Sequence, residues 1–457
     1  MLRLSYDLRT KRVTVVNDNE NRVTKGTIAR AAFAAVLIFI LLATAVGYCA
    51  SERNFGTDTS IPTAIAPASA VEEAHPSFLY GRIAIAAGAT YEGRLRWGRG
   101  RGQETFWGDY FNGFKSQNPW AVHVPPERLG QDPTRIFGIE IGGGSKRDLG
   151  RPVMARFGDI ARIESLGRDV RLTLKSGTVL ITNYSAFNDL DDGVRVWDRR
   201  QGVLDVGSRQ VRTIDFLSAP AAGPLPHRLH GTVHTRSGDF TGFVQWDRNK
   251  GLGADELGGR TANGDLRVRF DTIRSIARQG QNSLVTLLDG REILRTGPES
   301  GQANLGIYVD DPRFGRVLVS WDAFERLDFS PGGGGPAYGD FPPGLPLTGI
   351  VTTRTGRRLA GRLVYDLDES ETTETLDAPA QQVDYTIPFG LITSIVLPGR
   401  DERARVALSN GEQLQLDRRG DLGEGNAGML IFVDGSQRPE YVLWTDVERV
   451  DFQHPSR

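Results

Sequence analysis

Cysteine is nearly absent from this 457-residue chain, which has one, and histidine is scarce, at six residues. A single cysteine excludes a disulfide within one chain and a cysteine-rich zinc site. A large charge of one sign is also missing, because 55 Lys and Arg face 56 Asp and Glu. That balance argues against a generally basic nucleic-acid binder and against an acidic disordered tail. The G-x-S-x-G, H-E-x-x-H and P-loop patterns do not occur either, so no common catalytic motif names an activity.

Length and composition indicate several folded domains. With domains of about 150 residues, the chain has room for about three. Hydrophobic residues make up 39% of the chain, which is enough for packed cores and argues against disorder of the whole chain. The 55 glycines follow no Gly-X-Y period, and such an excess suits many tight turns.

One long uncharged apolar run lies near the N-terminus, at residues 31–50 (AAFAAVLIFILLATAVGYCA). A helix of this length covers about 30 Å, the hydrocarbon thickness of a bilayer. Residues 1–30 carry seven basic and three acidic residues, and basic flanks stay in the cytoplasm. The sequence therefore predicts a single-pass membrane protein with a cytoplasmic N-terminus at 1–30, a transmembrane helix at 31–50 and the bulk of the chain outside.

A cleaved secretory signal is the alternative interpretation of this segment. Its basic flank, apolar core and small-x-small site at Ala43–Ala45 are typical of signal peptides, and cleavage would leave a secreted or periplasmic protein. We favour the uncleaved anchor because the apolar run exceeds the usual core of about 7–15 residues. Cys49 is interpreted as a small apolar residue of the span rather than as a lipid-modified one, since the bulky Tyr48 precedes it.

Small, proline-containing linkers at 51–78, 217–228 and 330–346 precede three copies of one pattern. The distance from the first to the last phenylalanine landmark of each copy is 59, 59 and 63 residues, from Phe157 to Phe216, Phe270 to Phe329 and Phe389 to Phe452. Such agreement predicts three repeats. We name them repeat 1 (79–217), repeat 2 (229–329) and repeat 3 (347–452).

Apolar and polar residues alternate between glycine turns in every repeat, which predicts antiparallel strands with one buried face. V-x-L-x-x-G-x-x-L hairpins followed by an F-x-x-I-x-x-I turn divide each repeat into two lobes. This pattern resembles small closed barrels of the SH3 or Sm type. The expected fold is therefore all-β, with three tandem repeats of two such lobes after one N-terminal transmembrane helix. A six-bladed, propeller-like arrangement is the alternative, because propeller blades have a similar length.

Histidines and acidic turns offer little for a metal. His230 and His234 share one face of a strand start, with Asp239 or Asp247 as further ligands, but the other two repeats lack these histidines. The acidic turn at 188–193 has glycine in the sixth place yet lacks the acids of a calcium loop at its third and twelfth places. We therefore expect no metal and no other cofactor.

One acid recurs near the end of each repeat, as Asp215, Asp328 and Asp451. A charge on an edge strand prevents pairing with other chains, so we interpret these acids as edge protection. Three equivalent positions also suit a structural role better than a single active site.

Repeat 1 is longer than the other two. From Trp97 to Phe157 is 60 residues, whereas the corresponding spans in repeats 2 and 3 are 24 residues each, which places about 36 extra residues near 98–145. Long loops on rigid β scaffolds usually carry function, aromatic rings stack on sugars or apolar anchors, and arginines hold anions. In the alternative interpretation, the rings fold back and plug the end of the scaffold. The candidate binding residues are Trp97, Arg99, Arg101, Trp107, Tyr110, Phe111 and Trp120.

Tandem repeats without unique polar clusters present surface rather than chemistry. We therefore expect a non-catalytic binding or scaffolding module of the bacterial cell envelope, with the membrane and an envelope protein or glycan as partners and no nucleic acid. The alternative function is a carboxylate-dependent glycan hydrolase. It needs two acids at roughly 5–9 Å across one cleft, and Glu104 and Asp109 are the candidates.

Overall fold

The structure is a computed structural model, and it describes residues 2–7, 12–17, 57–67, 74–98, 104–115, 118–125, 134–136, 139–141, 151–183, 189–220, 227–296, 305–399, 402–434, 436 and 438–453. The predicted span at 31–50, with Cys49, lies outside these residues, as do Arg99 and Arg101. Within them, no helix has the length and apolar character that crossing a membrane requires.

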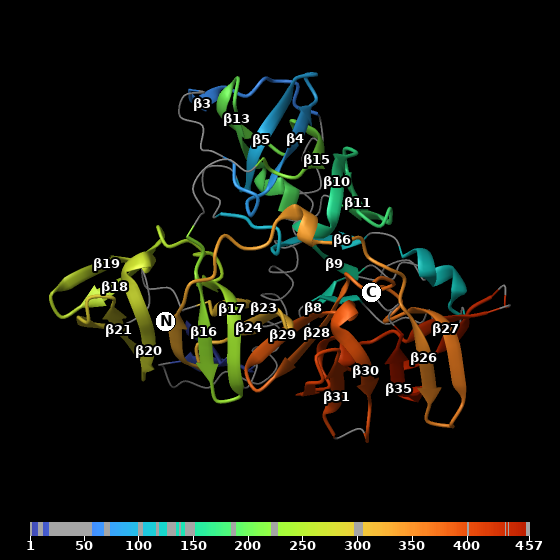
Figure 1. Cartoon of the computed structure of the whole chain (residues 1–457). Coiled ribbons are helices and arrows are strands. Elements are labelled where there is room, and N and C mark those ends of the chain that lie inside the picture. Colours follow the sequence, from blue (N-terminus) through green and yellow to red (C-terminus); the bar gives the residue numbers. More distant parts are fainter. Residues whose placement is uncertain are drawn as a thin grey trace. The chain divides into compact units, whose positions relative to one another are not determined.

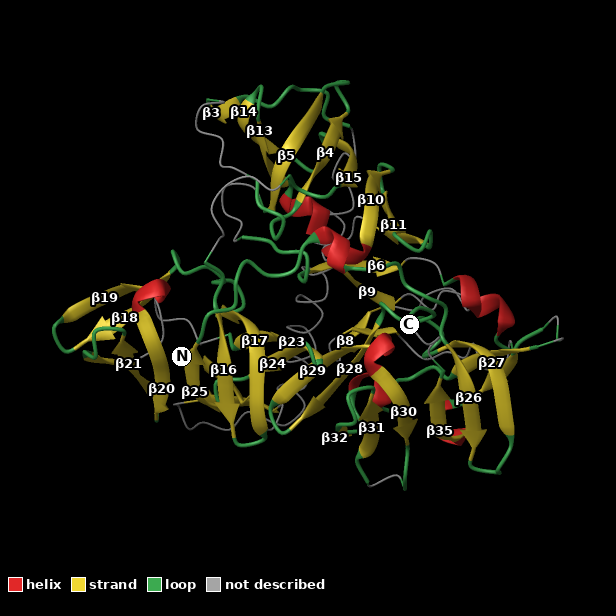
Figure 2. Cartoon of the chain, viewed as in Figure 1, coloured by secondary structure: helices red, strands yellow, loops and turns green. Residues whose placement is uncertain are grey.

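The chain forms two compact units, Met1–Gly56 and Thr57–Arg457. In the first, β1 (Leu2–Asp7) pairs with β2 (Arg12–Asn17) as an antiparallel hairpin. The second is built almost wholly from antiparallel strands, and the only helices among its described residues are 3-10 turns of three to five residues (Figures 1 and 2). The all-β prediction is confirmed.

The strands of repeat 1 follow one order, which recurs in the other two repeats. In repeat 1 the order is β14 (Gly202–Val206), β13 (Val194–Asp198), β5 (Thr90–Trp97), β4 (Tyr80–Ile85), β15 (Val211–Phe216), β10 (Ile160–Ser165), β11 (Asp169–Leu174) and β12 (Val179–Asn183). In repeat 2 it is β24 (Gly315–Val319), β23 (Ile307–Asp311), β17 (Gly238–Trp246), β16 (His230–Thr235), β25 (Phe324–Phe329), β20 (Ile273–Gln279), β21 (Asn282–Leu287) and β22 (Glu292–Arg295). In repeat 3 it is β34 (Glu440–Val442), β33 (Met429–Val433), β27 (Arg358–Val364), β26 (Thr348–Thr353), β35 (Val447–Phe452), β30 (Ile392–Val396), β31 (Ala404–Leu408) and β32 (Gln413–Leu416).

Each repeat also contains one further hairpin, and the three hairpins pair differently. The hairpin of β6 (Tyr110–Lys115) and β9 (Arg151–Arg156) continues the sheet of repeat 1 at β12, and the hairpin of β18 (Glu256–Thr261) and β19 (Gly264–Arg269) forms a sheet of its own. The hairpin of β28 (Thr375–Ala380) and β29 (Val383–Pro388) pairs with β24, so repeats 2 and 3 share a ten-stranded sheet.

One short strand joins the sheet of repeat 1, and two others form a separate two-stranded sheet. The tether strand β3 (Ala64–Ala66) pairs with β14, and β7 (Thr134–Ile136) pairs with β8 (Ile139–Ile141). No sheet of the described strands closes on itself. The small closed barrels of the SH3 or Sm type therefore stay a prediction.

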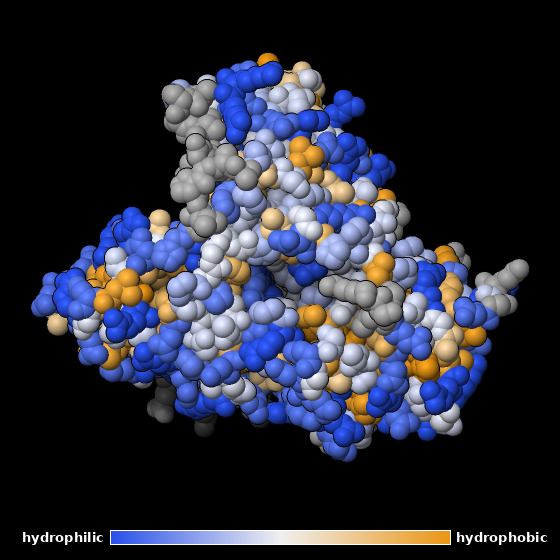
Figure 3. Space-filling view, viewed as in Figure 1, coloured by the Kyte–Doolittle hydropathy of each residue, from blue (hydrophilic) through white to orange (hydrophobic). Residues whose placement is uncertain are grey.

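The phenylalanine landmarks anchor the cores. Phe157, Phe270 and Phe389 each open a 3-10 turn, and all three side chains are buried. Their rings meet the aromatic residue at the end of the second strand of each repeat, at 4.8 Å in repeat 1 (Trp97), 6.3 Å in repeat 2 (Trp246) and 5.1 Å in repeat 3 (Tyr365). The alternating strand residues complete these cores, and hydrophilic residues dominate the visible surface (Figure 3).

Candidate functional site

Most of the extra length of repeat 1 lies at the tip of the β6–β9 hairpin. Residues 116–150 connect these strands, whereas two residues connect β18 to β19 and β28 to β29. The preceding turn is common to all repeats: Phe106 N–H donates to Asp109 Oδ2 at 2.8 Å, and the same bond joins Leu252 to Asp255 and Glu371 to Glu374. The aromatic residues 106–114 therefore occupy the same framework positions as residues of repeats 2 and 3.

The candidate rings of repeat 1 lie inside it. Trp97, Trp107, Tyr110 and Phe111 are all buried, and Trp107 is fully so. Trp107 packs on Phe216 and Tyr338 at 5.8 and 4.6 Å, and its indole N–H donates to Pro76 O at 2.8 Å. Buried rings are what we expect from the alternative interpretation, in which the rings fold back and plug the end of the scaffold. The binding role of Arg99 and Arg101, outside the described residues, stays a prediction.

Asp109 connects the hairpin of repeat 1 to repeat 2. Its Oδ1 accepts from Gln245 Nε2 at 2.5 Å and from Arg316 Nη2 at 2.7 Å. Arg316, on β24, also pairs with Asp310 at 2.7 Å, and its guanidinium lies 5.2 Å from the centre of the Tyr110 ring. The two carboxylates more than offset the cost of burial, so the pKa of Arg316 lies well above its usual value.

A second arginine is buried beside this contact. Arg228 is 2% exposed, and its guanidinium lies 3.6 Å from the centre of the Phe106 ring and 4.3 Å from that of Phe243. Among the described residues, its Nε and Nη2 have no hydrogen-bond partner. Burial lowers the pKa of Arg228 to about 10. The ring faces replace part of the lost hydration by cation–π attraction, so Arg228 acts as packing between repeats 1 and 2.

The same hairpin reaches repeat 3 through both of its strands. Lys115, at the end of β6, pairs with Asp368 and lies 3.7 Å from Glu374. Arg151, at the start of β9, pairs with Asp366 at 3.2 Å. The side chains of Lys115 and Asp368 are each 8% exposed, so this pair is almost fully removed from water.

The loop beyond β6 adds a small apolar contact with repeat 3. The 3-10 turn Pro119–His123 begins at Asn118, whose side-chain amide donates to Leu367 O at 2.7 Å. The ring of Trp120 meets that of Phe432 at 5.9 Å, and the guanidinium of Arg362 lies 5.4 Å from the Trp120 ring centre. Among the candidate rings that the structure describes, only Trp120 therefore packs against an aromatic ring of another repeat.

Negative charge exceeds positive charge at this junction. Six carboxylates act on one another there, against the two cations Lys115 and Arg151; they are Asp366, Asp368, Glu369, Glu374, Asp377 and Asp421. Burial, the largest cause, raises the pKa values of Asp366 and Glu374 to about 6, and it holds those of Glu369 and Asp421 well above their usual values. At neutral pH the electrostatic interactions among the charged groups of this junction are therefore unfavourable.

The linker at 330–346 is packed on repeat 1. Lys175 donates to Tyr338 O at 2.6 Å and to Phe341 O at 2.8 Å, and its ammonium lies 3.4 Å from the centre of the Tyr338 ring. Burial lowers the pKa of Lys175 to about 8. This linker is therefore part of the contact between repeats rather than a loose spacer.

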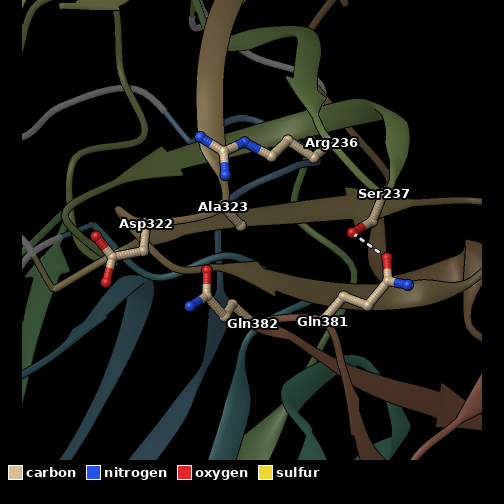
Figure 4. A pocket seen from close by; sticks show the side chains of 6 residues that line it. All are labelled: Arg236, Ser237, Asp322, Ala323, Gln381 and Gln382. Atoms are coloured by element: carbon tan, nitrogen blue, oxygen red, sulfur yellow. Dashed lines mark hydrogen bonds between the residues drawn. The ribbon is translucent and has the colours of Figure 1, made fainter. Parts of the chain in front are cut away.

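A pocket of about 390 Å³ opens where repeats 2 and 3 meet (Figure 4). Ser237 Oγ donates to Gln381 Oε1 across its edge at 2.7 Å. Gln381 and Gln382 form the turn between β28 and β29 with φ of 51° and 69°, in the left-handed region. The pocket is lined by five polar residues and one alanine, which are Arg236, Ser237, Asp322, Ala323, Gln381 and Gln382.

The acids of the hydrolase hypothesis are both engaged in ion pairs. Glu104 pairs with Arg94 at 2.6 Å, with both side chains almost fully buried, and Asp109 pairs with Arg316. Neither acid lines the pocket of Figure 4. This arrangement gives the two carboxylates a structural role.

The candidate metal ligands do not converge on one site. His230 Nδ1 lies 2.9 Å from Ser330 Oγ, while His234 bridges Asp239 at 2.9 Å and Asp328 at 3.2 Å. Over the described ranges, no group of three or more His, Cys, Asp or Glu side chains is placed to hold a metal ion.

The interpretation of the recurring acids as edge protection is wrong. The strands β15, β25 and β35 that carry them each have a neighbour on both sides, so they are not edges. Each acid instead pairs with an arginine: Arg162 with Asp215, Arg326 with Asp328 and Arg449 with Asp451, at 2.5 to 2.6 Å. Their recurrence reflects a surface ion pair on a central strand.

No protein family matches the chain, and no curated protein or solved structure is similar enough to count as a match.

Proposed function

We propose that the chain is a membrane-anchored, exported β-repeat protein that acts as a non-catalytic binding or scaffolding module of the bacterial cell envelope. The anchor is the apolar run at 31–50 with its basic flank, and the exported part comprises three tandem repeats of two SH3- or Sm-like lobes. The common strand order of the three repeats supports the repeat plan. Its partners are the membrane and an envelope protein or glycan.

One observation carries the scaffolding part of the proposal. The β6–β9 hairpin of repeat 1 contacts repeat 2 through Asp109 and repeat 3 through Lys115 and Arg151. Buried charged groups at these contacts cost stability unless their geometry is kept. A protein that fixes its repeats against one another in this way presents one rigid surface to its partners.

Localisation tests the anchor and its orientation. The full chain with a C-terminal epitope should sediment with membranes and resist extraction at high salt and high pH. In intact spheroplasts, added protease should remove the epitope, while a tag before residue 1 stays protected. A chain recovered from the cytosol, or an epitope that is cut only after lysis, would contradict the proposal.

Shortening the hairpin tests the contact. Replacing residues 116–150 with Asn-Gly gives β6 and β9 the two-residue turn that the other repeats have, and Asn-Gly suits such a turn. In cells, crosslinking should capture an envelope partner with the intact chain and lose it with this variant. The matched control is Arg260→Ala with Arg267→Ala, at side chains of repeat 2 that are 80% and 81% exposed; it keeps the length, removes only two surface charges and should leave capture unchanged. Capture that survives both changes would place the partner elsewhere.

A further inference from the structure

In the common strand order, the first strand occupies an equivalent position in every repeat. The three equivalent strands differ in what pairs with their outer edge. They are β14, β24 and β34, each lying next to β13, β23 or β33. The backbone groups on the outer side of such a strand are open to pairing with another strand. The three cases show what fits this position.

In repeat 2 the position is filled completely. The edge of β24 pairs with β29 at four consecutive residues in unbroken register, from Arg316 with Thr386 to Val319 with Val383. Alternate side chains of β29 are buried, at Val383, Tyr385 and Ile387. An alternating apolar strand is therefore a good occupant of this edge.

In repeat 3 the strand at this position is protected from pairing with a further strand. The strand β34 has three residues, and no described strand lies on its outer side. Pro439 precedes it at the place where β24 has Arg316, and proline has no N–H to donate. A short strand with proline is a known protection of sheet edges.

In repeat 1 the strand beside β14 is β3 (Figure 2), and it holds the position only weakly. The five-residue β14 contains no proline and pairs with β3 at two residues only, Val203 with Ala66 and Leu204 with Ala64, across a break in register. Ile65, between these paired residues, is 53% exposed, so β3 buries little apolar surface there. The tether is fixed mainly before the strand, where Gln210 Nε2 donates to Ser60 Oγ at 2.7 Å.

We propose that the outer edge of β14 is a strand-addition site for an extended segment of a partner protein, and that β3 is a strap which this segment displaces. The inference rests on the proposed binding function and names the partner class as protein. The fitting segment alternates apolar and polar residues, as β29 does in Val-Asp-Tyr-Thr-Ile-Pro. The binding event would release the stretch of chain that follows the predicted membrane span.

The register of repeat 2 also predicts a charge preference. Asp384 of β29 lies opposite Leu318, and the residue of β14 equivalent to Leu318 is Asp205. Like charges directly opposite one another in a sheet are unfavourable. A segment with a basic residue in the place of Asp384 should therefore bind β14 more tightly than one with an acid.

The probe is a synthetic peptide with the sequence of residues 382–389 that carries Asp384→Lys. Against the purified full chain in detergent, it should bind several-fold more tightly than the unchanged peptide. Ala64→Pro with Ala66→Pro removes two donors of the strap and should tighten binding about tenfold, because the strap no longer competes. Hydrogen exchange should slow in residues 202–206 when the peptide binds. Ile65→Ala, which keeps the backbone pairing, should leave the affinity unchanged.

The inference would be overturned by no binding to either chain, by binding without added protection at 202–206, or by equal affinity for both chains. Concentration-dependent self-association of the proline variant without peptide would also overturn it, because the occupant would then be a second copy. None of these results bears on membrane localisation, so a failure here leaves the proposed function to its own test.

Discussion

The side chain of Asp109 makes contacts both within repeat 1 and with repeat 2. Its two oxygens close the turn at Phe106 and hold Gln245 and Arg316 of repeat 2. From the sequence, Asp109 is a candidate catalytic acid because it lies in the long insertion of repeat 1. Its actual partners are more than a hundred positions away, and no local pattern identifies partners so distant in sequence.

Changing Asp109→Asn should keep the turn and remove the charge that faces Arg316. Hydrogen bonds to charged groups contribute about 1.5–3 kcal/mol, and Arg316 keeps its pair with Asp310, so we expect a loss of about 2 kcal/mol in the free energy of unfolding. Chemical denaturation measures it. Asp265→Asn, at a side chain that is 87% exposed, is the control and should change stability by less than about 0.5 kcal/mol.

Trp107→Ala should destabilise the fold whatever the protein binds. Its ring is fully buried against Phe216 and Tyr338, and truncating a buried aromatic costs about 3–5 kcal/mol. The midpoint of urea unfolding should fall accordingly, while Val122→Ala, at a side chain that is 80% exposed, should leave it unchanged. A loss below about 1 kcal/mol would contradict the placement of Trp107 in the core.

At the scale of elements, the sequence predicts strands well and their partners poorly. Alternation and glycine turns locate the hairpins, and the phenylalanine landmarks at Phe157, Phe270 and Phe389 are all buried. The pairing of β29 with β24 joins two repeats across a linker, and nothing in either strand's own pattern reports it. Lysine is rare in this chain, at six residues, and one of them, Lys115, lies among carboxylates of repeat 3.

The junction of repeats 1 and 3 should make stability depend on pH. Burial raises the pKa of Glu374 from 4.5 to about 6, so the folded chain holds this proton more tightly than the unfolded chain. The contribution is present below about pH 4.5, and it is lost as pH rises through 6. Relative to Glu374→Gln, the free energy of unfolding of the wild type should fall by about 2 kcal/mol between these limits.

Denaturation series at pH 4.5, 5.5, 6.5 and 7.5 would measure this difference. The matched control is Glu256→Gln, at a side chain that is 50% exposed and paired only at the surface. If the wild type and Glu374→Gln keep parallel profiles, the carboxylates at the junction do not titrate as their burial requires.

At the scale of the whole molecule, one hairpin contacts repeats 2 and 3 through separate side chains, so loss of one contact should open that junction and leave the other in place. Lys115→Met leaves Asp368 without its cation and Glu374 without its nearest positive charge. Breaking a buried pair in this way costs about 3–5 kcal/mol. We expect faster hydrogen exchange in residues 151–156 and 366–369 and unchanged exchange in 273–287, far along the chain in repeat 2. Uniformly faster exchange would mean that the pair supports global stability instead.

Length, linkers and recurring landmarks predict a division into segments in which the linkers are spacers. Lys175 binds the backbone of the linker at Tyr338 and Phe341, and β24 before the linker pairs with β29 after it. These contacts are made by backbone carbonyl groups and by strand edges, and neither leaves a pattern of residue types in the sequence. The sequence therefore predicts the parts, and the structure shows contacts between them that the sequence does not report.

That continuity limits how the polypeptide can be cut. A fragment ending in the Gly- and Pro-rich stretch at 330–346 would keep β24 and lose β29, which exposes the backbone of Arg316–Val319 and uncovers Val317 and Val319. Bare edges of this kind recruit other chains into aggregates. Truncations designed from the apparent boundary should precipitate, and a soluble expression fragment has to carry residues 229–452 as one piece.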